Sequence, residues 1–201
     1  MADKGETTRA RILDEAVRLA RRDGLEGLSI GTLAAALAMS KSGLFAHFGS
    51  REALQVATLE RAAELVRARV APPADLPPGP GQLRHQLRAI EDWIDDPELP
   101  GGCPITGACV EFDDRDGPVR ETLERIQRHT HQRAAELFDA FAHPSWDRDQ
   151  LAFQLRAICL GYHHASRMLR DPRARAWAGS ALEALLAAAA RPAERPADRT
   201  Q

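Results

Sequence analysis

The residues best suited to chemistry lie in one short stretch, Ser40-Lys-Ser-Gly-Leu-Phe-Ala-His-Phe48. Ser40 is a good N-cap for a helix that begins at Lys41, because its hydroxyl can accept a hydrogen bond from a backbone N–H of the first turn. The remaining N–H groups of that turn and the positive end of the helix dipole suit a phosphate group. Gly43 has no side chain, so the backbone there can approach a ligand closely. The stretch therefore predicts contact with a polyanion.

Two short helices must position this stretch. An Ala-rich run predicts a helix over 30–37, and a second is predicted over 41–47, with a tight turn between them. Isolated helices of fewer than about a dozen residues are marginal in water, so both must pack against a longer neighbour. The apolar stripe of a helix predicted over 6–22 supplies that neighbour. Two short helices with a tight turn, supported by a third, form a helix-turn-helix module, which is typical of DNA binding.

Arg51 is a further candidate for phosphate contact. Ser50 is predicted to cap the next helix, and Arg51 lies in its first turn. A cation at that position is unfavourable for the helix dipole, which suggests that Arg51 has a function.

Several short segments, in this order along the chain, resemble those of a known family: Thr8-Arg9, Ile12-Leu13, Leu33-Ala34, Met39–Phe45, His47-Phe48 and Ser50–Leu54. Over roughly residues 8–60 the chain resembles the DNA-binding domain of TetR-family transcriptional regulators. The resemblance implies an all-helical homodimer with an N-terminal DNA-binding domain and a C-terminal domain for effector binding and dimerisation. It also implies DNA contacts at the major groove by Lys41, Ser42 and Gly43, at or near the phosphates by Phe45, His47 and Arg51, and to the DNA backbone by Thr32.

Two residues depart from the family's usual pattern. Phe45 stands where the family usually has Tyr, so a hydroxyl that could donate to a phosphate is missing. Ala38 stands in the turn where the family usually has Gly, which costs up to about 1 kcal/mol if that residue is left-handed.

Composition favours an all-α protein. The 201 residues include only 5% aromatics, and Ala, Leu and Arg dominate the helical-looking stretches. With 27 basic and 29 acidic residues the formal net charge is −2, which argues against a nucleic-acid coat protein or a basic RNA-binding tail. The periodicity predicts about nine helices, over 6–22, 30–37, 41–47, 51–70, 81–96, 103–113, 117–142, 148–170 and 173–190.

Proline, glycine and charge indicate the domain organisation. Residues 71–81 contain five prolines and interrupt the helical pattern. Residues 1–70 hold 11 basic and 9 acidic residues, so the acidic excess lies in the remainder of the chain. We expect a helix-turn-helix DNA-binding domain over 1–50, an effector-binding and dimerisation domain over 51–190, and a disordered tail over 191–201.

We expect a cytoplasmic protein with no membrane association. The N-terminal stretch has no apolar segment of the kind found in secretory signals, and no apolar run approaches the ~20 residues that cross a bilayer. Three cysteines are an odd number, which argues against a secreted disulfide scaffold.

The second half of the chain contains the effector candidates. The segment Pro100-Gly-Gly-Cys103 and its continuation are similar to a TetR C-terminal domain type that carries Gly-Gly-Cys. We expect a pocket for an unknown small-molecule effector among the helices at 81–96, 103–113, 117–142 and 148–170. Its candidate residues are Trp93, Cys103, Cys109, Glu111, Phe112, Tyr162 and His163. The alternatives are core packing for Trp93, Cys103, Cys109 and His163, and an exposed helix edge for Glu111.

Three functional alternatives follow. The preferred one is an effector-responsive repressor that binds a pseudo-palindromic operator as a homodimer through the helices at 148–170 and 173–190. The second is a redox- or electrophile-sensing regulator that uses Cys103, whose place at a helix start favours the thiolate. The third, of another class, is a helical small-molecule-binding protein or enzyme in which the helix-turn-helix is incidental. We expect no catalytic residues, because no phosphate loop, nucleophile elbow or zinc-protease motif occurs, and no metal or cofactor.

Overall fold

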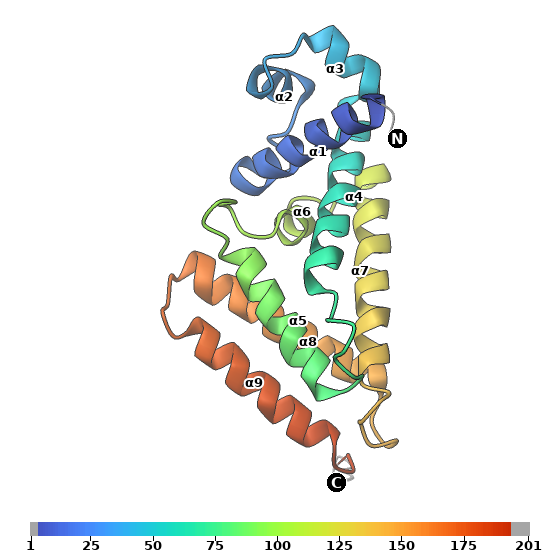
Figure 1. The fold of residues 1–201 in the computed structure, drawn as a ribbon, viewed down its shortest axis with the longest axis vertical. Coiled ribbons are helices and arrows are strands. Elements are labelled where there is room, and N and C mark those ends of the chain that lie inside the picture. Colours follow the sequence, from blue (N-terminus) through green and yellow to red (C-terminus); the bar gives the residue numbers. More distant parts are fainter. Residues whose placement is uncertain (1–3, 194–201) are drawn as a thin grey trace. The chain divides into compact units, whose positions relative to one another are not determined.

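The computed structural model describes residues 4–193, and within that range the chain is helical, with no strand (Figure 1). The all-α prediction is therefore confirmed. The elements are α1 (Lys4–Asp23), α2 (Ile30–Ala36), α3 (Lys41–Phe48), α4 (Arg51–Val70), α5 (Pro80–Ile94), α6 (Pro104–Glu111), α7 (Pro118–Leu137), α8 (Arg148–His163), the π-helical turn η1 (His164–Met168) and α9 (Ala174–Ala189).

The chain divides into two compact units. Unit 1 consists of residues up to 71 together with 92–127, and unit 2 consists of residues 72–91 together with those from 128 on. Unit 1 holds α1 to α4, α6 and the first half of α7, and unit 2 holds most of α5, the end of α7, α8, η1 and α9.

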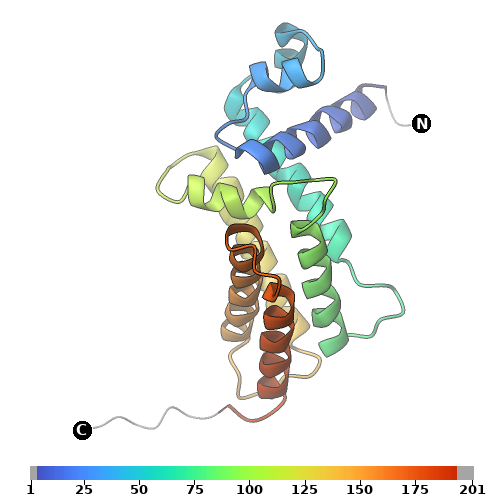
Figure 2. The same ribbon diagram turned by 90° about the vertical axis from the view of Figure 1, so that its left-hand side faces the viewer.

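Unit 1 is built around the crossing of α1 and α4. Figures 1 and 2 show α2 and α3 side by side next to α1, and α6 packs against both α1 and α4. The apolar stripe of α1 lies in the core, as its helical spacing predicts. The fully buried members of this core include Ile12, Ala16, Leu25, Leu28, Leu33, Leu44, Leu54, Leu59, Ala62 and Ala108. The two short helices are thus held by a core that they share with longer ones.

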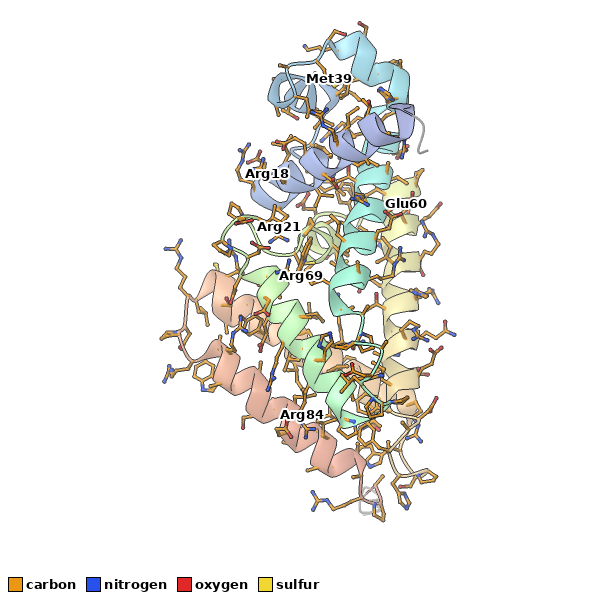
Figure 3. All side chains as sticks on the ribbon, in the orientation of Figure 1. Arg18, Arg21, Met39, Glu60, Arg69 and Arg84 are labelled. Atoms are coloured by element: carbon orange, nitrogen blue, oxygen red, sulfur yellow. The ribbon has the colours of Figure 1, made fainter. Side chains whose placement is uncertain are left out.

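Unit 2 is centred on the pair α8 and α9, which pack along each other. Leu151, Leu155 and Leu182 are among its buried apolar residues. Two ion pairs join α5 to α9 in this unit. Arg84, labelled in Figure 3, binds both carboxylate oxygens of Glu183 at 2.6 and 2.7 Å, and Arg175 pairs with the buried Glu91 at 3.3 Å.

Two helices, α7 and α8, end well before the residues that their periodicity predicts. α7 stops at Leu137 instead of 142, because the chain turns to bury Phe138 completely, and the N–H of Ala142 donates to the Phe138 carbonyl at 2.9 Å. α8 stops at His163, and the expected helix to 170 continues as η1, where the N–H of Leu169 donates to the His164 carbonyl five residues back. Hydrophobic spacing does not distinguish these local turns from a continuing helix.

The C-terminal tail predicted over 191–201 lies largely outside the described residues, which end at 193. Its first residues make hydrogen bonds: the Arg191 carbonyl accepts from Trp146 Nε1 at 2.9 Å, and the N–H of Ala193 donates to Ser145 Oγ at 2.8 Å. None of the helices between residues 4 and 193 combines the length and apolar character needed to cross a membrane.

Candidate nucleic-acid interface

The start of α2 is fixed by a reciprocal pair of hydrogen bonds. The Ser29 hydroxyl accepts from the N–H of Thr32 at 3.1 Å, and the Thr32 hydroxyl accepts from the N–H of Ser29 at 3.0 Å. This arrangement is a capping box with Thr in the third helical position. The Thr32 side chain, predicted to face the DNA backbone, is exposed, and its hydroxyl takes part in the cap.

The turn between α2 and α3 contains a left-handed alanine. Ala38 has φ +52°, and the N–H of Met39 returns to the carbonyl of Ala34 at 3.0 Å. Figure 3 labels Met39 in this turn. The position therefore has the backbone conformation that favours glycine, and the Cβ of Ala38 is energetically unfavourable there.

α3 begins as predicted, with its N-terminus capped by Ser40. The Ser40 hydroxyl accepts from the N–H of Gly43 at 3.1 Å. Neither α2 nor α3 has an acidic residue in its first turn. The Lys41 side chain runs toward the first turn of α2: a Cβ placed on Gly31 would lie 3.9 Å from Lys41 Nζ. The ammonium group and the start of α3 together form an acid-free, electropositive corner of the module.

The two faces of α3 differ sharply. Leu44 is completely buried in the core of unit 1, and Phe48 is half-buried with the Arg9 guanidinium 5.4 Å from its ring centre. Most of the predicted DNA-contacting residues of α3 are exposed to solvent: Lys41, Ser42, Phe45 and His47, with Gly43 half-buried. The helix is therefore held in the core through Leu44 and Phe48, and the predicted contact residues around them stay exposed.

Arg51 has partners within the protein. Its Nε donates to the carbonyl of Leu28 at 3.1 Å, its Nη2 donates to the Glu26 carbonyl, and the guanidinium lies 3.4 Å from the Glu26 carboxylate. The Arg115 guanidinium, with Arg51 nearby, holds the pKa of the Glu26 carboxyl below its ordinary value. Arg51 thus ties the start of α4 to the loop between α1 and α2.

The effector candidates are divided between the two units. Five of them belong to unit 1: Trp93 and Phe112, which are buried, and Cys103, Cys109 and Glu111, which are half-buried. Cys103 is the N-cap residue of α6, and Cys109 accepts a hydrogen bond from Gln127 Nε2 at 3.1 Å. Unit 2 contains the buried Tyr162, which has the Arg175 guanidinium 6.0 Å from its ring centre, and the half-buried His163.

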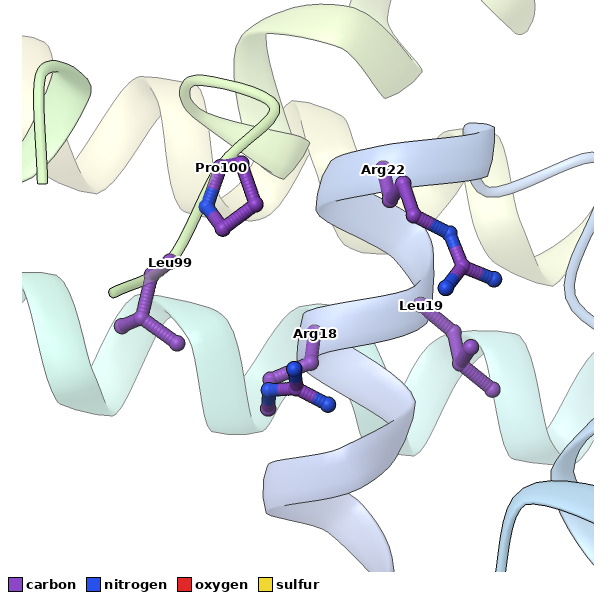
Figure 4. Close-up of a pocket in the computed structure, with 5 residues that line it drawn as sticks. All are labelled: Arg18, Leu19, Arg22, Leu99 and Pro100. Atoms are coloured by element: carbon purple, nitrogen blue, oxygen red, sulfur yellow. The ribbon is translucent and has the colours of Figure 1, made fainter. Parts of the chain in front are cut away.

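A surface pocket in unit 1 is lined by none of these candidates. It is lined by Arg18, Leu19, Arg22, Leu99 and Pro100, from α1 and the loop before α6 (Figure 4). Arg18 pairs with Glu15 at 3.0 Å and Arg22 pairs with Asp23 at 2.7 Å, so both cations of the pocket are already neutralised by neighbours. Among residues 4–193 there is no group of three His, Cys, Asp or Glu side chains able to hold a metal.

Two side chains, Arg21 and Glu111, join α1 and the loop after it to the α6 region, and the sequence predicted this role for neither of them. Arg21, labelled in Figure 3, is buried: it donates to the carbonyls of Leu99 and Trp93, each at 2.8 Å, and lies 4.3 Å from the Trp93 ring centre. Glu111 accepts from the N–H groups of Leu25 and Glu26 at 3.2 and 2.7 Å. These contacts span 72 to 86 residues of sequence, so no local pattern signals them.

Comparison with known proteins agrees with this geometry. Residues 12–58 match the family described as "Bacterial regulatory proteins, tetR family", and residues 79–182 match "Tetracyclin repressor-like, C-terminal domain". No curated protein matches the chain.

Solved structures of similar fold cover nearly the whole chain. A TetR transcriptional regulator from Chloroflexus aurantiacus is 28% identical, with a TM-score of 0.78 over 92% of this chain and 94% of that one. A TetR-family regulator from Streptomyces coelicolor is 24% identical, with a TM-score of 0.81 over 91% and 96%. AibR, whose structure is a complex with isovaleryl coenzyme A and operator DNA, is 22% identical, with a TM-score of 0.67 over 89% and 98%.

The helix-turn-helix of unit 1 and the all-helical remainder define a transcriptional regulator of the helix-turn-helix class. The chain belongs to the TetR family of bacterial transcriptional regulators.

Proposed function

We propose that the protein is an effector-responsive repressor that binds a pseudo-palindromic operator as a homodimer. The observation that carries this proposal is the exposed face of α3, which has no acidic residue and lies beside the Lys41 ammonium group. Such a face suits the negative potential of a DNA groove, since phosphate charge dominates the affinity of protein–DNA complexes.

We assign the DNA-binding residues by their positions on the module. Lys41, Ser42 and Gly43 lie at the start of α3, where a recognition helix meets the major groove. His47 and Phe45 lie further along the exposed face. Thr32 and Arg51 flank the module and complete the proposed contact set, with Arg51 also supporting the loop at Glu26. In this assignment residues 1–50 bind DNA, and residues 51–190 bind the effector and form the dimer.

The dimer is proposed to form through α8 and α9. Phe153, Ala157 and Leu160 lie on the exposed side of α8 at positions i, i+4 and i+7, and Phe153 is 67% exposed. On α9, Trp177, Ala181 and Ala184 repeat the same spacing and are also exposed. Two such faces from two subunits can form a four-helix interface with small residues that allow close approach. A dimer also supplies two recognition helices for half-sites about one helical turn apart, ~34–36 Å.

The effector is proposed to act by shifting a conformational equilibrium. A hydrophobic small molecule bound in the C-terminal domain would favour a dimer conformation whose recognition helices have the wrong spacing for the operator, with α4 as the connecting lever. AibR, which has a similar fold, was solved in complex with both isovaleryl coenzyme A and operator DNA. This supports the proposal that one such fold can bind a small molecule and DNA. Native mass spectrometry of the purified protein would identify the chemical class of a co-purifying effector.

Fluorescence anisotropy tests DNA binding directly. The labelled duplex is the DNA upstream of the protein's own gene, and the control is a scrambled duplex of the same length and composition, both titrated at several salt concentrations. We expect at least a thousandfold preference for one upstream segment at physiological salt. Equal affinity for the two duplexes would contradict the proposal and favour a helical small-molecule-binding protein. A promoter–reporter assay with and without the regulator then tests repression, which should lower reporter expression.

A further inference from the structure

The exposed face of α3 carries an aromatic ring without a packing partner in the core. Phe45 is 54% exposed, and Ala46 beside it is also exposed. Because this ring lies on the exposed side of the recognition helix, DNA docked on that helix would cover it and gain the free energy of its burial. With Lys41 one turn earlier on the same side, this face combines an apolar patch with a positive charge.

The side chains of α3 offer little hydrogen bonding to bases. The helix Lys41-Ser-Gly-Leu-Phe-Ala-His-Phe48 contains no Arg, Asn, Gln, Asp or Glu, which together with Lys make most of the specific pairings with base edges. The Ser42 hydroxyl lies 3.3 Å from the Ser40 hydroxyl within the cap, and the Lys41 ammonium runs toward α2. The His47 ring lies 6.3 Å from the Phe48 ring, toward the end of the helix. The outward centre of the helix is therefore apolar.

A phenyl ring cannot hydrogen-bond to a phosphate, so the position of Phe45 needs a different partner. In the major groove the apolar feature is the 5-methyl group of thymine, which protrudes from each A·T pair and distinguishes it from the other pairs. A ring on the presented face of a recognition helix meets that groove when the helix docks.

We propose that Phe45 is a specificity-determining residue that reads thymine in each operator half-site by packing its ring, with Ala46, on the 5-methyl group. The inference rests on the proposed DNA-binding function and adds the base chemistry that α3 recognises. Lys41 supplies phosphate attraction, whereas Phe45 supplies discrimination between thymine and the other bases.

The experiment begins with selection from duplexes that carry a randomised 24-base-pair segment, using the full-length protein. The enriched duplex is then synthesised in a series of versions. Each version has deoxyuridine in place of thymidine at one symmetric position in both half-sites, which removes only the methyl group. Burial of one methyl group is worth about a fourfold change in affinity. At the position that Phe45 contacts, loss of the methyl group from both half-sites should therefore weaken wild-type binding about 15-fold.

Two variants make the test specific to the ring. Phe45→Ala should bind the thymidine duplex about as weakly as wild type binds the deoxyuridine duplex, and it should not respond to the methyl group. Val110→Ala removes an apolar side chain that is 73% exposed on α6, and should retain wild-type affinity and methyl sensitivity. Phe45 is exposed, so the melting temperature of Phe45→Ala should match that of wild type, and anisotropy at low salt should show unchanged non-specific binding.

Three results would overturn the inference. Enrichment of a sequence in which no thymine methyl matters would exclude thymine readout while leaving operator binding intact. Sensitivity to deoxyuridine that persists in Phe45→Ala would assign the methyl contact to another residue. Failure to enrich any sequence would overturn the DNA-binding proposal together with this one.

Discussion

Ala38 shows how a single backbone angle determines the effect of a side chain on the free energy of unfolding. Its φ of +52° is in the left-handed region, where a Cβ is unfavourable by roughly 1–2 kcal/mol, while glycine loses about 0.5–1 kcal/mol of backbone entropy on folding. We therefore expect Ala38→Gly to raise the free energy of unfolding by about 0.5–1 kcal/mol, measured by urea denaturation. The matched control is Ala35→Gly within α2, which should lower it by a similar amount. A loss of stability in Ala38→Gly would contradict the strain assigned to this turn.

Lys41 is the residue whose charge should be visible in the salt dependence of operator binding. Each phosphate contact that is lost lowers the slope of log K against log salt concentration by about one, so Lys41→Ala should reduce it by that amount for each subunit. Fluorescence anisotropy at several salt concentrations measures the slope. Arg133→Ala, which removes an exposed cation from α7 in unit 2, should leave the slope unchanged. An unchanged slope in Lys41→Ala would remove the phosphate role.

Cys159 on α8 has a thiol whose pKa is shifted by its surroundings. Burial raises the pKa of its thiol to about 11 from an ordinary 9.0. The unfolded chain therefore binds fewer protons than the folded chain above pH 9, so this thiol makes the protein less stable as pH rises from 9 toward 11. We expect Cys159→Ala to lose less stability than wild type between pH 8 and pH 10.5 in urea denaturation. Parallel losses in the two proteins would contradict the shifted pKa.

At the scale of elements, α6 is joined to the loop after α1 by one carboxylate. Glu111→Ala would leave the N–H groups of Leu25 and Glu26 without their acceptor, and Leu25 is buried, so we expect a loss of about 1–3 kcal/mol of unfolding free energy. Glu111→Gln keeps an acceptor oxygen and should lose less. Chemical denaturation provides the measurement.

The control for this element is an exposed ion pair. Glu60, labelled in Figure 3, binds Arg125 at 2.9 Å with both side chains largely exposed. Surface pairs contribute about 0–1 kcal/mol, so Glu60→Ala should cost clearly less than Glu111→Ala. Equal losses would mean that Glu111 acts as an ordinary surface charge rather than as an acceptor for backbone N–H groups.

Gly101 supports the same junction at the last turn of α1. Its φ is +113°, and a Cβ there would lie only 1.8 Å from the carbonyl oxygen of Arg21. The backbone of the loop therefore approaches the last turn of α1 more closely than any side chain permits. Glycine at 101 and the buried Arg21 thus act together, because the first allows the approach and the second binds the loop carbonyls.

At the scale of the whole molecule, the proposed dimer links the two recognition helices. Phe153→Glu places a charge on the exposed side of α8, and burying that charge in an interface is costly. We expect monomers in analytical ultracentrifugation and a large loss of operator affinity, because two half-sites are no longer bound by one particle. Val110→Glu, which changes a similarly exposed apolar residue on α6, should remain dimeric. If Phe153→Glu remains dimeric, the dimer interface does not include this side of α8.

The sequence by itself determined the features that depend on near neighbours. The helices follow from apolar spacing of 3.6 residues, and the caps at Ser29, Ser40 and Ser50 follow from a hydroxyl that reaches an N–H three residues on. On α3 the i, i+4 spacing predicted that Leu44 and Phe48 face inward, whereas the outward place of Phe45 was implied only by the resemblance to the family. For this reason the all-α fold, the helix-turn-helix and the positions of Lys41 and Phe45 within it were predictable.

The tertiary structure alone decided which distant groups meet. The partners of Arg21 and of Glu111 lie up to 86 residues away, and the early ends of α7 and α8 depend on how Phe138 and η1 pack or turn. Such contacts leave no periodic trace in the sequence, because a hydrogen bond between remote residues depends on the three-dimensional path of the chain between them. Local hydrogen bonds and hydrophobic spacing thus predicted the DNA-reading module, whereas long-range packing determined how that module is joined to α6.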